Sequence, residues 1–332
     1  MLDKKSLFGD EIWSRERKTS SWRRGITEQI QNSGWQFHFF QVLLWGGDKE
    51  YTLRWMKKVS IKDFVVGEDS PLLVVSGPCV IESEDHAMEC AEFLTRFFAK
   101  RSLSFVFKAS YDKANRTSID SFRGPGIEQG LKILEKIKTT FDVPVLTDVH
   151  SSEEAYEAAK ICDIIQIPAF LARQTDIVVA AGRSGAVVNV KKGQFMAPWD
   201  MKNVINKLVS TGNEKILLTD RGTSFGYQNL VSDMRAIPIM QGLGYPVLFD
   251  ATHSVQLPGG LGGQSGGQRE FIPVLARAAL ASGCNGIFAE SHPNPAQAKS
   301  DSASVLSFEA LPKLVDQWER IYETMQLLCA KL

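Results

Sequence analysis

Polar and ionisable side chains follow the apolar runs of this sequence at regular intervals. They are Cys79, Lys108, Asp148 with His150, Gln166, Lys191, Asp220 with Arg221, Asp250 with His253, and Glu290 with His292. Burying this many ionisable groups is unfavourable unless they are paired or bind a ligand. A purely structural protein does not need such an arrangement, so the pattern indicates a functional site.

Cations are prominent among these groups and their neighbours, namely Lys108, Lys113, Arg116, Lys191 and Arg221. The whole chain has 38 Lys+Arg and 38 Asp+Glu, so this excess is local, and no overall field favours nucleic acid or membranes. The cluster suits a substrate with several negative charges, because arginine forks match phosphate and carboxylate. A Schiff-base role for Lys108 or Lys191, as in an aldolase, stays open from spacing alone.

A second set could bind a divalent cation. A thiolate, an imidazole and two carboxylates come from Cys79, His253, Glu290 and Asp301. Such a mixed set accepts zinc, iron, manganese or similar ions. The spacing forms no compact motif, so Cys79 could instead be a small buried residue.

The remaining histidines and cysteines have simpler interpretations. His150 and His292 compete with His253 as ligands, and His86 is expected at the surface of a helix. The other cysteines are expected to be buried packing residues; these are Cys90, Cys162, Cys284 and Cys329. Five cysteines without a CxxC spacing argue against a disulfide framework and favour a reducing, cytoplasmic setting.

The elements that carry these groups alternate between short aliphatic runs and longer amphipathic segments. The runs are LLVVS (72–76), SFVFK (104–108), VPVLTD (143–148), IIQIP (164–168), AVVNVK (186–191), KILLTD (215–220), PVLFDA (246–251) and GIFAE (286–290). Helix-like segments such as 84–100, 127–140 and 201–210 lie between most of them. This alternation predicts parallel strands and an α/β fold.

Eight such units in roughly 260 residues predict a (β/α)8 TIM barrel. The competing doubly wound sheet lacks support because no GxGxxG follows the first run. In such a barrel the carboxyl ends of the strands form the active site, so the polar groups above would share one face.

Residues 1–60 have a different character, with scattered charges and most of the tryptophans. We predict a poorly ordered N-terminal extension before a catalytic barrel of residues 61–332, and a start-site artefact with Met56 as the alternative start would account for it. An accessory segment is the alternative. The longest apolar stretch there, 37–45, is too short to span a bilayer and follows no signal-peptide plan.

Two loops complete the predicted site. PGGLGGQSGGQR (258–269) is rich in glycine and suggests a mobile lid that excludes water during reaction. SYDKANRTSIDSFRGPG (110–126) offers cation, hydroxyl and amide donors suited to a phosphorylated polyol.

The motifs GPCVIES, FKASYDKANRTS, SFRGPG, TDVH, IPAFLARQTD, NVKKGQF, DRGTSFGY, FDATHSVQLPGG and AESHPNP occur in this order over about residues 70–325. Together they closely resemble the 3-deoxy-D-manno-octulosonate 8-phosphate synthase family. The resemblance implies a (β/α)8 barrel, usually a homotetramer. The implied reaction condenses phosphoenolpyruvate with D-arabinose 5-phosphate and releases inorganic phosphate, in lipopolysaccharide biosynthesis.

The resemblance also assigns roles by position. Residues matching the phosphoenolpyruvate site are Lys108, Lys113, Gln166, Lys191 and Arg221. Asn115, Arg116 and Thr117 match the pentose-phosphate segment, with the arginine and hydroxyl reaching in from a neighbouring subunit. Thr117 replaces the more common serine and keeps the hydroxyl donor. Candidates for catalysis are Lys108, Asp148, His150 and Asp301.

The family has one form that needs a divalent metal and one that does not. Cysteine at the position of Cys79 marks the metal-dependent form, whereas asparagine marks the other. The resemblance therefore implies a metal site of Cys79, His253, Glu290 and Asp301, and leaves the identity of the metal open.

Three rival functions share part of this pattern. The related 3-deoxy-7-phosphoheptulonate synthases use erythrose 4-phosphate and resemble KPRTS where this chain has KANRTS. A Schiff-base aldolase on the same fold is the second rival. A non-catalytic phosphosugar sensor is the third, and it would be expected to have lost some charged strand ends.

Overall fold

A closed ring of parallel strands forms the centre of the structure, a computed structural model that describes residues 56–116, 118–260 and 265–329. The ring runs through β3, β4, β5, β6, β7, β8, β11 and β14, and β14 pairs with β3 to close it. Their bounds are Leu73–Gly77, Ser104–Lys108, Val145–Asp148, Ile164–Ile167, Val187–Lys191, Ile216–Asp220, Val247–Asp250 and Gly286–His292. Each corresponds to one of the predicted runs, so the (β/α)8 barrel is confirmed.

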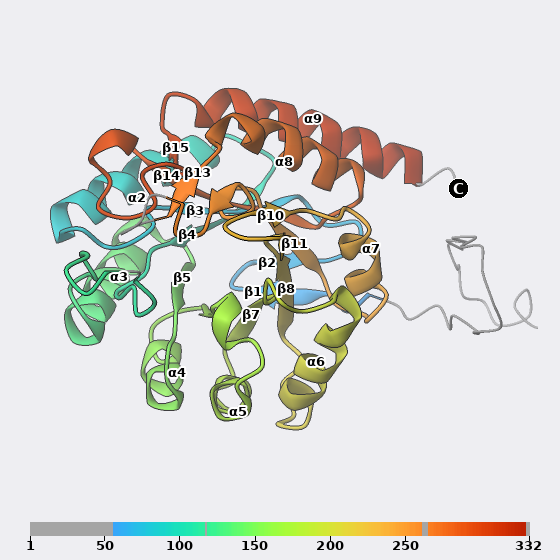
Figure 1. The fold of residues 1–332 in the computed structure, drawn as a ribbon, viewed down its shortest axis with the longest axis horizontal. Coiled ribbons are helices and arrows are strands. Elements are labelled where there is room, and N and C mark those ends of the chain that lie inside the picture. The colour runs from blue at the N-terminus through green and yellow to red at the C-terminus, as the bar shows by residue number, and fades with distance from the viewer. Residues whose placement is uncertain (1–55, 117, 261–264, 330–332) are drawn as a thin grey trace, which may run out of the picture. The chain divides into compact units, whose positions relative to one another are not determined.

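Helices alternate with the strands and cover the outside of the ring (Figure 1). They are α2 (Glu84–Phe98), α3 (Ile127–Phe141), α4 (Ser152–Ala159), α5 (Thr175–Arg183), α6 (Met201–Val209), α7 (Ala236–Gln241), α8 (Ile272–Ala281) and α9 (Leu311–Cys329). Local signals set their limits: the Ser83 side chain caps α2 by accepting a hydrogen bond from the backbone N–H of His86. None of the helices in the described part of the chain is long and apolar enough to cross a membrane.

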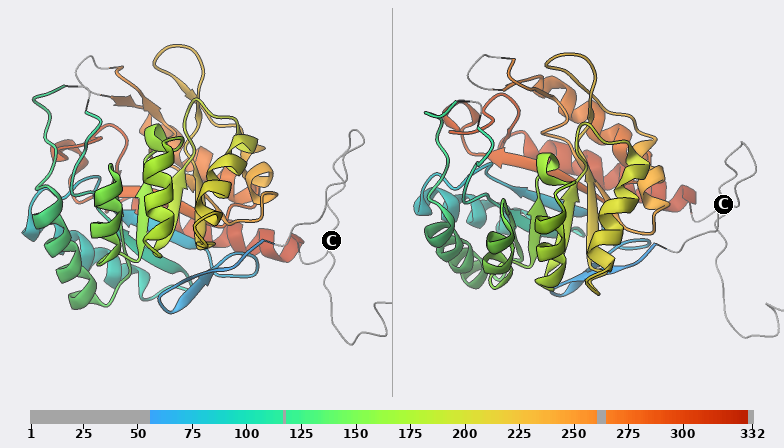
Figure 2. Two further views of the ribbon diagram at one scale, coloured as in Figure 1. Left: turned by 90° about the horizontal axis from the view of Figure 1, so that it is seen from below. Right: turned by 60° about the horizontal axis from the view of Figure 1, so that its bottom comes forward.

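The apolar residues form two layers, one between strands and helices and one inside the ring. The inner layer includes Val75, Leu146, Leu217 and Phe288, which come from different strands. A hairpin of β1 (Val59–Ile61) and β2 (Phe64–Val66) packs on this inner layer. Figure 2 shows the hairpin at one end of the ring and longer loops at the other. The amino end is therefore closed by apolar packing, which leaves the carboxyl end for polar groups.

The carboxyl-end loops carry short additional pairings. β9 (Thr223–Ser224) pairs with β10 (Leu230–Val231), β12 (Gln256–Leu257) pairs with β13 (Gly266–Gly267), and β15 (Leu306–Ser307) pairs in parallel with the end of β14. The predicted lid, 258–269, thus includes the connection between β12 and β13, of which residues 261–264 lie outside the described residues. Residues 1–55 of the predicted extension also lie outside, so the division at residue 60 stays a prediction.

Candidate active site

A hollow of about 390 Å³ opens at the carboxyl ends of the strands. Its lining includes predicted site residues from most parts of the barrel, namely Lys113, Asn115, Arg116, Asp148, His150, Lys191, Arg221, His253 and Asp301. A larger hollow of about 840 Å³ lies near α2 and α9, but no strand end reaches it. The chemistry therefore belongs to the first hollow.

Lys191 and Arg221 supply buried positive charge on one side of this hollow. The Lys191 ammonium lies 2.6 Å from Asp250 Oδ2 and 3.8 Å from the centre of the Phe288 ring. Arg221 Nη2 donates to the carbonyl of His253 and to Gln256 Oε1, at 3.0 and 2.7 Å. Its Nε is buried and has no hydrogen-bond partner among the described residues. A guanidinium held with a donor to spare suits an anionic ligand.

Asp148 is the centre of a second group of contacts in the hollow. Its carboxylate accepts hydrogen bonds from Ser110 Oγ and Gln166 Nε2, and Lys113 Nζ lies 3.5 Å away. Burial alone would raise the pKa of Asp148, but the nearby lysines, Lys113 foremost, outweigh it and hold the pKa well below its usual range. Asp148 is therefore an ionised, orienting acceptor and a weak base.

A row of side chains inside the ring holds Gln166 in place. Asp148, Gln166 and Asn189 lie in register on β5, β6 and β7. Asn189 Nδ2 donates to Gln166 Oε1 at 2.8 Å, and Thr219 Oγ1 donates to Asn189 Oδ1 at 2.8 Å. Because each acceptor is occupied, the Gln166 amide is turned with its donor toward Asp148.

His150 is oriented by Glu154, one turn along from it at the start of α4. Glu154 Oε2 lies 3.0 Å from His150 Nδ1, and it accepts hydrogen bonds from the His150 backbone N–H and the Tyr111 hydroxyl, both at 2.7 Å. A proton on Nδ1 would be shared with Glu154, which leaves Nε2 as an acceptor on the hollow's wall. Glu154 was not among the predicted residues.

The predicted metal donors converge where the first and last strands of the ring meet. Cys79 Sγ and carboxylate oxygens of Glu290 and Asp301 all lie within 4.8 Å of one another. His253 Nε2 lies 3.5 Å from Glu290 Oε2 and 3.6 Å from Asp301 Oδ2. The four predicted ligands are therefore neighbours, whereas His150 and His292 belong to other contacts.

Glycine at position 77 makes the approach of Cys79 possible. A Cβ on Gly77 would lie 2.1 Å from the carbonyl oxygen of Lys108 on the neighbouring strand, a separation that real atoms do not show. The carbonyl of Cys79 in turn accepts a hydrogen bond from Lys108 Nζ at 2.9 Å. The break in the apolar run thus allows the chain to turn inward beside β4 and place the thiol in the site.

His253 is held by a carboxylate behind it. Asp250 Oδ1 and Oδ2 lie 3.0 and 2.8 Å from His253 Nδ1. Burial lowers the pKa of His253, but the carboxylates of Asp250 and Glu290 outweigh it, so the pKa is raised overall. A carboxylate on one ring nitrogen is the usual arrangement behind a metal-binding histidine, because it leaves the other nitrogen facing the ion.

The donor set has the properties of a cation site. Glu290 Oε2 is buried and has no hydrogen-bond partner within the described ranges. Burial raises the pKa of the Cys79 thiol well above its ordinary value, and the Asp301 and Glu290 carboxylates raise it further. Without a cation the thiol stays protonated and donates to Ser300 Oγ and Asp301 Oδ2, at 2.9 and 3.1 Å. A divalent cation would occupy the unpaired oxygen and favour the thiolate.

The segment that the resemblance matches to pentose-phosphate binding lies beside the hollow. Asn115 and Arg116 line the hollow, and Thr117 lies outside the described residues. Arg116 donates through Nε to the carbonyl of Phe122 and through Nη2 to the carbonyl of Lys299, at 2.9 and 3.0 Å. These contacts are with its own chain.

Two further expectations can be compared with the structure. Cys90, Cys162 and Cys284 are buried and unpaired, as predicted, whereas the side chain of Cys329 lies outside the description. His86 is on a helix as predicted, but it is only partly exposed, because its ring lies against that of His292 with 4.6 Å between the centroids.

The fold and the site together define a (β/α)8 barrel enzyme whose strand ends gather cations beside a group of metal-type donors. Residues 54–327 match the model of the DAHP synthetase I family, and the chain belongs to that family.

Similar curated proteins carry a more specific name. The chain is 61% identical over 271 residues to a 2-dehydro-3-deoxyphosphooctonate aldolase of Protochlamydia amoebophila (strain UWE25). The aligned region covers 82% of this chain and 98% of the relative. It is 59% identical over 266 residues to a protein of the same name from Geotalea uraniireducens (strain Rf4), covering 80% and 98%. A third, from Geobacter sulfurreducens (strain ATCC 51573 / DSM 12127 / PCA), is 57% identical over 265 residues, covering 80% and 97%.

Proposed function

We propose that this protein is a transferase that condenses phosphoenolpyruvate with D-arabinose 5-phosphate and water. The products are 3-deoxy-D-manno-octulosonate 8-phosphate and inorganic phosphate, and the sugar serves lipopolysaccharide biosynthesis. The observation that carries the proposal is the gathering of Lys113, Lys191 and Arg221 around one hollow in a chain without net charge. Two phosphorylated substrates, one also a carboxylate, need such a site.

The chemistry follows from the two substrates. C3 of phosphoenolpyruvate attacks the pentose aldehyde and forms the new C–C bond, while water adds at C2. The resulting hemiketal phosphate collapses with cleavage of its C–O bond, which releases inorganic phosphate. Every atom of the three reactants appears in the two products.

The side chains have separable tasks in this reaction. Lys113, Lys191 and Arg221 bind the carboxylate and phosphate of phosphoenolpyruvate and stabilise the charge that develops as phosphate leaves. Lys108 and Gln166 help to bind phosphoenolpyruvate from the barrel interior. Asn115, Arg116 and Thr117 bind the pentose phosphate. Asp148 orients Lys113, and His150 exchanges a proton through Nε2.

We propose a divalent metal as the cofactor, held by Cys79, His253, Glu290 and Asp301. The unpaired oxygen of Glu290 and the placing of Asp250 behind His253 support this assignment. When bound, the ion supplies Lewis-acid polarisation that orients the aldehyde or helps to deliver the water.

A homotetramer and a cytoplasmic location complete the proposal. The tetramer would let Arg116 and Thr117 serve a site of a neighbouring subunit. The free cysteines support a reducing compartment, since Cys90, Cys162 and Cys284 are buried without disulfide partners in the part of the chain that the structure describes.

The direct test is phosphate release from phosphoenolpyruvate with D-arabinose 5-phosphate, before and after chelation, for the unmodified chain and Cys79→Ala. We expect chelation to abolish activity, and added divalent metal to restore it to the unmodified chain alone. Activity with erythrose 4-phosphate in place of the pentose would overturn the substrate assignment. Borohydride trapping of a substrate on Lys108 or Lys191 would indicate a Schiff-base aldolase instead. No turnover with either sugar, but tight binding, would favour a sensor.

A further inference from the structure

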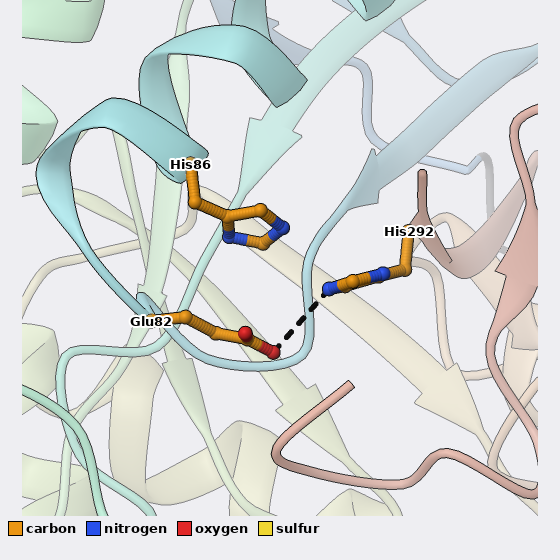
Figure 3. A group of neighbouring side chains, drawn as sticks. All are labelled: Glu82, His86 and His292. Atoms are coloured by element: carbon orange, nitrogen blue, oxygen red, sulfur yellow. Dashed lines mark ion pairs between the residues drawn. The ribbon is translucent and has the colours of Figure 1, made fainter. Parts of the chain in front are cut away.

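A second group of ligand-type side chains lies beside the metal donors. Glu82, His86 and His292 place one donor atom each within 4.8 Å of one another, and Figure 3 shows the three side chains facing a common point. Glu82 lies in the loop after β3, His86 in the first turn of α2, and His292 at the end of β14. Two of these segments also carry Cys79 and Glu290, so the two groups share their backbone.

The hydrogen bonding of His292 argues against a second cation there. The backbone N–H of Asn294 donates to His292 Nδ1 at 3.0 Å, and a backbone N–H can only donate. Nδ1 is therefore the unprotonated nitrogen, and the ring's proton is on Nε2. Glu82 Oε1 lies 3.3 Å from Nε2 along the dashed line in Figure 3, and Nε2 is buried without a hydrogen bond to any described residue. A metal ion on Nε2 would have to displace the proton.

Glu82 has a second contact, which leads to the metal donors. Its Oε1 accepts a hydrogen bond from the backbone N–H of Lys299 at 2.8 Å. The backbone carbonyl of Lys299 accepts a hydrogen bond from Arg116 Nη2 at 3.0 Å. Lys299 is thus held through both of its backbone polar groups, by Glu82 on one side and by the pentose-phosphate segment on the other.

The next two residues contact the thiol. Ser300 and Asp301 accept hydrogen bonds from Cys79 Sγ, and Asp301 has a φ of 52°, in the left-handed region. Residues other than glycine are uncommon there, although aspartate is among those that tolerate it. A backbone in this conformation needs contacts from its neighbours to stabilise it. The hydrogen bond of Glu82 to the Lys299 amide, two residues before Asp301, is one such contact.

We propose that Glu82 is a positioning residue for the metal donors: through Lys299 it fixes the loop that places Asp301 opposite Cys79. This inference rests on the proposed metal site. The carboxylate suits the task because the oxygen that accepts the hydrogen bond from the Lys299 amide also lies 3.3 Å from His292 Nε2, near the other end of the 292–299 segment. The Glu82 side chain is only 12% exposed, so water does not readily replace these contacts.

The test compares Glu82→Ala, Glu82→Gln and Asp85→Ala as full-length chains, each stripped of metal and titrated with Co²⁺. The thiolate-to-cobalt absorption band reports binding at Cys79, and a competing chelator gives the dissociation constant. Glu82→Ala is expected to weaken Co²⁺ binding by roughly 10- to 100-fold, the usual effect of losing a group that orients a metal ligand. Glu82→Gln keeps an oxygen that can accept the hydrogen bond from the Lys299 amide. Its dissociation constant for Co²⁺ is expected to stay within about threefold of that of the unmodified chain. Asp85 is an exposed carboxylate in the first turn of α2 and serves as the matched control.

Several results would overturn the inference. Equal Co²⁺ affinity in Glu82→Ala and Asp85→Ala would do so, even if the first variant unfolds at a lower temperature, because the role would then be structural alone. Two ions per unmodified chain, with one lost in Glu82→Ala, would make the group a cation site in its own right. An unmodified chain without any thiolate band would overturn the metal site itself, and this inference with it.

Discussion

The Lys108 ammonium and the Glu290 carboxylate form an ion pair inside the barrel, with Nζ 2.5 Å from Oε1 and each side chain 1% exposed. Lys108 also donates to the carbonyl of Cys79, whereas the second oxygen of Glu290 faces His253. The pair therefore connects the cation side of the site to the metal donors, and it fixes Glu290 while leaving one oxygen available.

Removing one partner of this pair should leave an uncompensated buried charge. Lys108→Met is expected to lower the unfolding free energy of the chelated protein by about 3–5 kcal/mol, measured by urea denaturation. Lys136→Met is the control, because it breaks an ion pair with Glu84 in which both side chains are substantially exposed, and it should change little. Equal effects of the two substitutions would contradict the account of a buried pair.

The row of hydrogen-bonded side chains inside the ring, from Asp148 through Gln166 and Asn189 to Thr219, predicts a second effect on stability. Thr219→Val keeps the shape of the side chain but removes the donor to Asn189 Oδ1. Leaving that buried acceptor unsatisfied should cost about 1–3 kcal/mol, and the reaction rate should fall because Gln166 loses its fixed orientation. Thr139→Val, which removes an exposed hydroxyl on α3, is the comparison. A loss of stability without any loss of rate would separate the row from the chemistry.

The spare donor of Arg221 makes a prediction about substrate binding. Arg221→Lys keeps the charge but loses the planar fork, so the KM for phosphoenolpyruvate should rise roughly tenfold or more. The KM for D-arabinose 5-phosphate should change less. Arg235→Lys, at an exposed arginine before α7, controls for the exchange itself. A rise confined to the pentose phosphate would move Arg221 to the other substrate.

The contact between Glu154 and His150 predicts a dependence of stability on pH. Burial raises the pKa of Glu154, but hydrogen bonds from His150 and Tyr111 outweigh it and lower the pKa from 4.5 to about 2. A carboxyl group whose pKa is lower in the folded than in the unfolded state stabilises the native state at pH values above the unfolded-state pKa. This stabilisation is lost as the pH falls through the folded-state pKa.

Glu154→Gln should therefore be less stable than the unmodified chain at neutral pH, and the difference should shrink as the pH falls from 4.5 toward 2. Urea denaturation at a series of pH values measures it. Glu157→Gln, on the same helix, shows how an exposed carboxylate behaves. A difference that persists unchanged at the acid end would mean that Glu154 acts through packing.

Much of the fold could be predicted from local patterns in the sequence, and the metal-donor set from the family resemblance together with the order of the strands. An apolar run followed by a polar residue marks a strand end wherever it occurs, as in VLTD (145–148), which ends at Asp148, and the closed barrel brings such ends together. The neighbourhood of Cys79 and Asp301 followed from the first and last strands being adjacent in a closed ring.

The supporting residues were harder to predict, because they depend on register and side-chain direction. Asn189 is a polar residue between two valines in the run AVVNVK, and its partner became evident only once the pairing of β6 with β7 was known. Glu154 lies one turn after His150, a spacing that could have suggested the contact. Glu82 stands close to Cys79 in the sequence, but its hydrogen bond to Lys299 depends on a loop conformation that no local motif specifies.

The hydrogen bond between Cys79 and Asp301 joins residues 222 positions apart in the chain. During synthesis, the thiol leaves the ribosome long before its carboxylate partner exists, and the two can meet only after the last strand has closed against the first. A nascent chain would carry the thiol unshielded throughout that interval. Measuring Co²⁺ binding by stalled chains of increasing length would therefore show at which length the barrel closes during translation.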